Sequence, residues 1–161
     1  MADEQAALGV ATTRPAERLL ASLGQLQAAP IRFEAAQDVP QGGVLCALPA
    51  LLVLGLLRHS QANFCLPAGY YPLETIFLAV AFLALARVPS LEALRYEPPG
   101  EWGKLLGLDR IPEVRTLRAK LELLCAQGAP VRNWSGTLAR EWMAAPPESA
   151  GSLYVDGHVR V

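Results

Sequence analysis

Hydrophobic and polar positions follow the period of an α-helix through most of this sequence. The pattern is clearest over 112–127, where apolar residues recur at helical spacing and the positions between them are mostly polar or charged. The apolar positions are Val114, Leu117, Leu121 and Leu124. This spacing puts them on one side of a helix. Pro112 is suited to open that helix and Gly128 to end it.

Similar patterns predict further helices and a mostly α fold. Segments 44–57 and 76–86 are almost wholly apolar and predict a buried helical core. Only 153–161 alternates with a period of two and contains β-branched residues, which predicts a strand. The apolar segment 76–86 lies within a helix predicted over 72–87, and the other predicted helices cover 15–26, 90–96, 102–108 and 133–143.

Turn residues divide the chain into four parts. Residues 1–38 are a polar lead-in with one helix, and 39–145 form a helical domain that contains a candidate helix-turn-helix at 101–127. Two prolines and a run of small residues make 146–152 a linker. The strand at 153–161 follows, or a short hairpin in its place.

Composition excludes some classes of protein and leaves others open. The chain has 161 residues, of which 52% are hydrophobic and 18% charged, so wholesale disorder is excluded. A net charge of −1 excludes a globally basic nucleic-acid binder. The charge is uneven, however. From residue 110 to residue 140 there are six basic residues and two acids, a local balance of +4. We therefore expect any anionic partner to contact this part.

Cysteine usage and the apolar runs bear on the compartment. The three cysteines lie far apart without metal-ligand spacing, and no basic segment followed by an apolar one marks a leader, so we expect a cytoplasmic protein. The runs at 43–57 and 76–86 are shorter than the roughly 20 residues of a spanning helix. One alternative stays open: a helical interaction or membrane-associated protein that uses the apolar region 44–86.

The segment 101–127 is the candidate DNA-binding element. A short helix, a turn and a second helix with a basic outer face is the arrangement that places a recognition helix on DNA. Arg115, Arg118 and Lys120 would contact phosphates, and Thr116 or Arg115 would reach a base edge. Arg110 in the turn completes the predicted set. The other interpretation is an amphipathic surface helix whose charged face is simply solvated.

Asp156 is the candidate metal ligand. A carboxylate on a strand beside a glycine binds a divalent cation when other carboxylates converge on it. An Asp-Gly pair between alternating apolar residues is equally typical of a two-residue hairpin turn. The sequence supports both interpretations, and His158 is best interpreted as a surface residue of the strand.

Taken in order, the segments resemble the N-terminal part of DDE-type transposases from bacterial insertion sequences. Four motifs contribute to the resemblance, which covers about residues 40–161. They are Pro-Ser-Leu-Glu-Ala-Leu at 89–94, Trp-Gly-Lys-Leu-Leu-Gly-Leu at 102–108, Arg-Ile-Pro-Glu-Val-Arg-Thr-Leu-Arg at 110–118 and Tyr-Val-Asp-Gly-His at 154–158.

The resemblance implies a helical DNA-binding region that leads into an RNase H-like catalytic domain. Asp156 matches the first catalytic acid of that family, which uses Mg²⁺ held by three carboxylates. The sequence ends five residues after Asp156, so we expect a transposase fragment without catalytic activity. Expected partners are DNA, bound weakly, and another copy of the chain or a full-length transposase. No small-molecule substrate and no membrane are expected.

Overall fold

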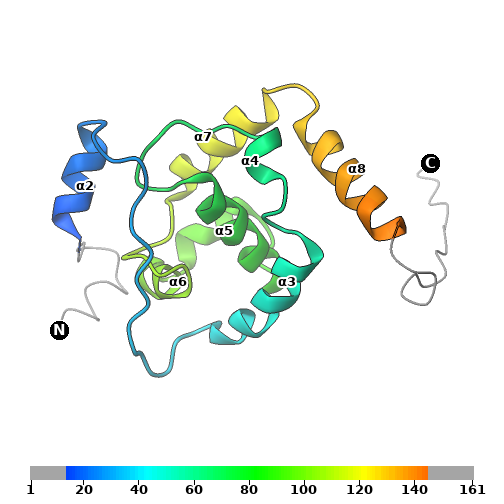
Figure 1. Cartoon of the computed structure of the whole chain (residues 1–161). Helices are drawn as coiled ribbons and strands as arrows, with labels where there is room; N and C mark the ends of the chain where they lie inside the picture. The colour runs from blue at the N-terminus through cyan, green and yellow to red at the C-terminus, as the bar shows by residue number, and fades with distance from the viewer. Residues whose placement is uncertain (1–13, 145–161) are drawn as a thin grey trace, which may run out of the picture.

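A computed structural model describes residues 14–144, which form a mostly α-helical fold with no strand in that range (Figure 1). This confirms the predicted fold class at that level. The predicted linker, the strand at 153–161 and Asp156 lie outside the described residues. The elements are α2 (Pro15–Ser22), the 3₁₀-helix η1 (Gly42–Ala47), α3 (Leu48–Leu54), α4 (Ser60–Asn63), α5 (Leu73–Leu85), the 3₁₀-helix η2 (Leu91–Tyr96), α6 (Pro99–Leu105), α7 (Val114–Cys125) and α8 (Pro130–Met143).

Helix α5 forms the centre of the core. In Figure 1 it lies in the middle of the molecule, with α3, α4, α6 and α7 around it. Ile76 and Ala79 of α5 are completely buried, and Trp102 of α6 and Leu117 of α7 are buried in the same cluster. The apolar run at 76–86 is therefore core, as its composition predicts.

The predicted amphipathic helix is confirmed as α7. Val114, Leu117 and Leu124 are buried, and Leu121 packs against the core. The helix begins two residues after Pro112, and Gly128 follows its end with a φ of +96°, a conformation that favours glycine. The periodic positions thus direct one side of α7 into the molecule and leave the other side for solvent.

The prediction of one buried helix over 44–57 is wrong. The segment forms η1 and then α3, which ends at Gly55 with a φ of +98°. Residues 52–54 of α3 are exposed, and Val53 keeps 74% of its surface accessible. Pro49 lacks a backbone N–H and fits only the first turn of a helix, so it splits the run into two short elements.

Helix α8 is attached to the rest of the domain along one side. Its Trp134 packs edge-on against Phe77 of α5 and donates a hydrogen bond of 2.7 Å to the carbonyl of Arg58. Farther along the helix, Glu141 pairs with Arg58 at 3.0 Å and with His59 at 2.5 Å. Side chains that lie beside α3 and α4 therefore determine where α8 lies.

The N-terminal segment is anchored by two arginines. Helix α2 contains no buried residue. Arg14, just before it, donates hydrogen bonds to the carbonyls of Pro30 at 2.6 Å and of Gly107 at 2.9 Å. Arg18 pairs with the buried Asp109 at 2.5 Å, and its guanidinium lies 3.6 Å over the ring of Tyr70. These polar contacts, together with the partly buried Ala21, which packs against the core, hold α2 on the turn that precedes α7.

Asp109 is the acceptor at the centre of this cluster. Besides Arg18, it accepts hydrogen bonds from the Tyr70 hydroxyl at 2.7 Å and the Arg110 backbone N–H at 2.8 Å. Burial alone would raise the pKa of Asp109, but the hydrogen bonds from Arg18 and Tyr70 outweigh burial and lower it. Burial and the bond to Asp109 both raise the pKa of Tyr70. The cluster is therefore held with Asp109 ionised and Tyr70 protonated.

Two further predictions concern the helix-turn-helix and the membrane. Both predicted helices are present as α6 and α7, but residues 106–113 connect them, where a helix-turn-helix uses about three or four. The helix-turn-helix itself stays a prediction. Among residues 14–144, no helix is both long and apolar enough to cross a membrane.

Candidate nucleic-acid interface

The outer side of α7 presents two arginines to solvent. Arg115 and Arg118 are exposed, while the apolar positions of the same helix point into the core. Arg115 makes no hydrogen bond or ion pair with residues 14–144. Its guanidinium is thus available to an external anion.

The other predicted DNA-binding residues of α7 lie on a different edge of the helix. Successive residues are rotated by about 100°, which puts Arg115 and Arg118 on one flank and Thr116 and Lys120 on the other. Thr116 and Lys120 are half-buried, and burial lowers the pKa of Lys120. The structure brings Arg115 and Arg118 together and separates them from the other pair.

Arg110 lies in the turn before α7 and is mostly enclosed. Its backbone carbonyl accepts a hydrogen bond of 3.2 Å from Tyr71, and its Nη1 lies 3.7 Å from Glu113. Its Nε is buried without a hydrogen-bond partner. Of the five predicted DNA-binding residues, Arg110 is the one whose backbone contacts Asp109, the acid that pairs with Arg18 of α2.

A third arginine joins Arg115 and Arg118 from outside the predicted set. Helix η2 packs against α7, and its Glu92 lies between Arg95 and Arg118. Ser90 caps η2 by accepting a hydrogen bond from the backbone N–H of Ala93. This 3₁₀ turn leaves both Glu92 and Arg95 exposed. The basic cluster consists of Arg95, Arg115 and Arg118, with Glu92 as the acid within it.

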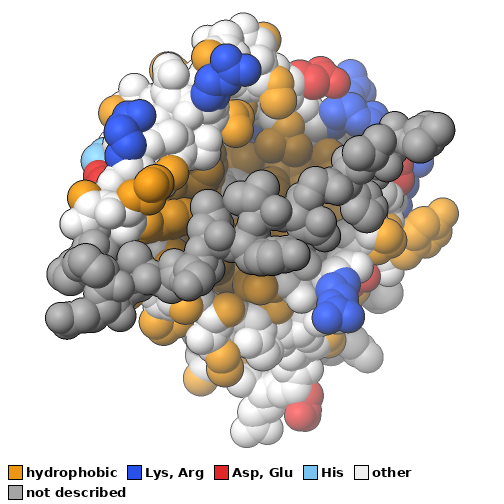
Figure 2. All heavy atoms as spheres, turned by 90° about the vertical axis from the view of Figure 1, so that its right-hand side faces the viewer, with side chains coloured by type: hydrophobic (Ala, Val, Ile, Leu, Met, Phe, Trp, Pro, Cys, Tyr) orange, Lys and Arg blue, Asp and Glu red, His pale blue; other side chains and the backbone are white. Residues whose placement is uncertain are grey.

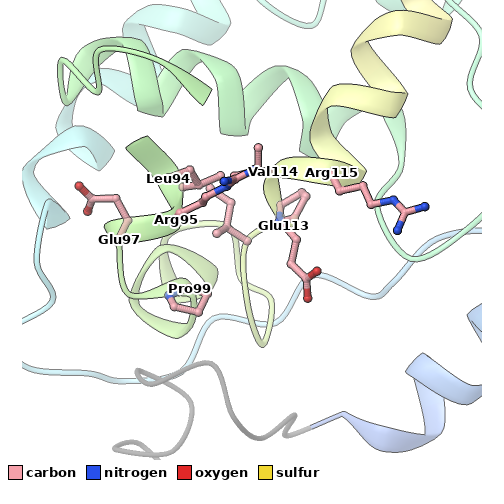
Figure 3. Close-up of a pocket in the computed structure, with 9 residues that line it drawn as sticks. Leu94, Arg95, Glu97, Pro99, Glu113, Val114 and Arg115 are labelled. Atoms are coloured by element: carbon pink, nitrogen blue, oxygen red, sulfur yellow. The ribbon is translucent and has the colours of Figure 1, made fainter. Parts of the chain in front are cut away.

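A pocket of about 430 Å³ lies beside this cluster, between η2, the start of α6 and the start of α7 (Figure 3). Figure 3 shows the side chains of Glu97, Glu113 and Arg115 pointing away from one another around it. Two arginines and two glutamates balance in charge, so the pocket by itself does not favour an anion. Its lining residues are Leu94, Arg95, Glu97, Pro99, Ile111, Pro112, Glu113, Val114 and Arg115.

The face on the α8 side has a different character. In Figure 2, hydrophobic side chains gather across the middle of this face, and Lys and Arg side chains lie toward its edges. Helices α3 and α8 lie toward this side in Figure 1, and each has exposed apolar residues, such as Val53 and Met143. The described side chains of this face are therefore more apolar than those on the basic flank of α7.

Comparison with known proteins places these features in a family. A family model described as "Transposase protein" matches residues 9–161, nearly the whole chain. The chain belongs to this transposase family. Neither a curated protein nor a solved structure matches it. Membership gives the chain a role related to transposition.

Within this transposase-family chain, sequence reasoning misses Glu92 and Arg95 as neighbours of the α7 arginines. They precede the first residue of α7 by 22 and 19 positions. Periodicity within α7 contains no information about which element covers its flank. The one local indication is the Ser-Leu-Glu-Ala-Leu-Arg pattern at 90–95, in which a capped turn exposes an acid and a base three residues apart.

Proposed function

We propose that this transposase-family chain binds duplex DNA through the outer side of α7, as a DNA-contacting part of a transposition protein. The supporting observation is the pair Arg115 and Arg118, exposed together on one flank of α7 while the apolar positions of the same helix are buried. Guanidinium groups match phosphate geometry and stay charged at any physiological pH.

The spacing of the two arginines supports contact with neighbouring phosphates. Residues three apart on a helix have Cβ atoms about 5–6 Å from each other. Two long side chains starting this close together can follow one strand of the duplex. Such contacts position a helix on DNA without reading its sequence, so we propose phosphate binding for Arg115 and Arg118 and no base specificity.

The proposal is tested by the salt dependence of binding. Fluorescence anisotropy of a short labelled duplex of mixed sequence, titrated with the full chain, should show affinity that falls as salt rises. Each lost phosphate contact removes about 0.9 from the slope of log K against log salt. The double variant Arg115→Gln/Arg118→Gln should therefore weaken binding at least tenfold and flatten the slope by about 1–2.

The matched control is Arg132→Gln, which removes the same charge from an exposed position of α8. It should change affinity less than either single variant in α7. Salt-independent or undetectable binding by the unmodified chain would contradict the proposal. Equal losses for Arg132→Gln and Arg115→Gln would show that net charge, not α7, determines binding.

The metal-dependent part of the predicted function rests on the resemblance alone. Asp156 lies outside the described residues, and residues 14–144 contain no group of three or more His, Cys, Asp or Glu that could hold a metal ion. The described residues therefore offer no fit for Mg²⁺, and we assign them no step in phosphodiester cleavage. Asp156 and Mg²⁺ stay predictions.

A further inference from the structure

Glu92 uses both carboxylate oxygens on the basic cluster. Its Oε2 accepts from Arg95 at 3.0 Å, and its Oε1 pairs with Arg118 of α7. The three side chains are exposed, at 48% for Glu92, 47% for Arg118 and 64% for Arg95. An anion thus already bridges two of the three arginines of this surface.

We propose that Glu92 is an intramolecular substitute for a DNA phosphate and thereby sets the affinity of the α7 surface. The inference rests on the proposed DNA binding. Without DNA, Glu92 holds Arg95 and Arg118 together at the junction of η2 and α7. When DNA docks, Arg118 exchanges the carboxylate for a phosphate oxygen.

The chemistry of the two anions supports this exchange. A carboxylate and a phosphate both present oxygens that guanidinium groups bind through parallel N–H bonds. The pair is exposed, and water screens such surface pairs, so Arg118 can leave Glu92 at small cost. Arg115 has no partner to leave among residues 14–144. We therefore expect Arg115 to bind a phosphate first and Arg118 to follow.

Charge counting gives the direction of the effect. The cluster of Arg95, Arg115, Arg118 and Glu92 has a net charge of +2, and +3 without the glutamate. Removing the carboxylate frees Arg118 and also removes an anion that repels the phosphates. Both changes favour DNA, so Glu92 lowers the affinity that the arginines alone would give.

A purely structural role for Glu92 predicts a different result. If the ion pairs fastened η2 to α7, their loss would weaken the fold. Leu94 of η2 and Val114 of α7 are both buried in the common core, however, and they join the two elements without the ion pairs. Urea unfolding of Glu92→Gln should therefore match that of the unmodified chain.

The experiment compares Glu92→Gln with Glu122→Gln in the full chain, by the same anisotropy titration over a series of salt concentrations. Glu122 is exposed on the same flank of α7, one turn after Arg118, and makes no ion pair with residues 14–144. Both variants change the charge equally, but only Glu92→Gln releases Arg118. The difference in DNA affinity between the two variants therefore measures the effect of releasing the arginines from Glu92.

We expect Glu92→Gln to bind about three- to tenfold more tightly at low salt and to steepen the salt slope by about 1. Replacing Arg118 as well should abolish this gain, so Glu92→Gln/Arg118→Gln should bind no more tightly than Arg118→Gln alone. Equal affinity of Glu92→Gln and Glu122→Gln, or weaker binding by Glu92→Gln, would overturn the inference while leaving DNA binding intact. Absence of salt-dependent binding in all variants would overturn the proposed function itself.

Discussion

Asp109→Asn tests whether the buried cluster fastens α2 to the turn before α7. The substitution keeps the shape of the side chain, but it removes the charge and turns one acceptor oxygen into an NH₂ group. That group would face the guanidinium of Arg18, which the carboxylate contacts at 2.5 Å and 3.1 Å. Two donors would then oppose each other where a charge-assisted pair exists now.

The size of the loss in unfolding free energy follows from the charged group, Arg18, that loses its partner. Removing one member of a buried ion pair costs about 3–5 kcal/mol. The side chain of Asp109 is 1% exposed, but that of Arg18 is 20% exposed and can recover some hydration. We therefore expect a loss near the lower end, about 3 kcal/mol, which lowers the urea midpoint by about 1–2 M for a domain of this size.

The assay is urea unfolding followed by tryptophan fluorescence, since Trp102 is buried in the core next to this turn. Glu122→Gln, an exposed acid, serves as the control and should change stability by less than about 0.5 kcal/mol. Arg18→Gln/Asp109→Asn should cost less than the sum of the single variants, because each single variant leaves its partner unpaired. A loss under about 1 kcal/mol for Asp109→Asn, or additive costs, would refute a fastening role.

Two further predictions concern pH and packing. The folded-state pKa of Asp109 is lowered, so its contribution to stability is present above the unfolded pKa of about 4 and is lost as pH falls through the folded pKa. The urea midpoints at pH 7 and pH 3 should therefore differ less in Asp109→Asn than in the unmodified chain. An equal difference in both proteins would exclude Asp109 as the source of the pH dependence. Gly103→Ala should destabilise by about 1–3 kcal/mol, since a Cβ there would lie 2.5 Å from the backbone of Arg110. Gly136→Ala in α8, whose nearest neighbour would lie 3.7 Å away, should stabilise by about 0.5–1 kcal/mol. Thermal melts measure both glycine variants, and shifts of the same sign would contradict the packing argument.

The sequence alone predicts α7 well, because its buried side repeats with the full helical period. The predicted and observed bounds differ by about two residues at each end. The outward position of Arg115 and Arg118 follows from the same pattern. Helix η2 is also predicted, since Ser90 precedes its beginning and caps it. Helix α8 ends at Met143 as predicted, but it begins at Pro130, three residues before the predicted start at 133.

Other features depend on contacts between distant residues. Asp109 looks like an ordinary turn residue until the fold places Arg18 and Tyr70 around it, 91 and 39 positions away. The apolar run at 44–57 predicts burial, but only the three-dimensional arrangement shows that residues 52–54 are exposed. The choice of Arg95 and Glu92 as neighbours of α7 has the same origin.

The anchoring of α2 by Arg18 and Asp109 has a consequence for how the chain forms during synthesis. Helix α2 is eight residues long and buries no side chain, and helices this short are marginal in water by themselves. Its partner acid is made 91 residues later, which at ordinary translation rates is a delay of about 5–20 s. During that interval α2 lacks the buried acid that anchors it through Arg18. Helix α2 therefore leaves the ribosome well before Asp109 and gains its buried ion pair only after that residue has been made.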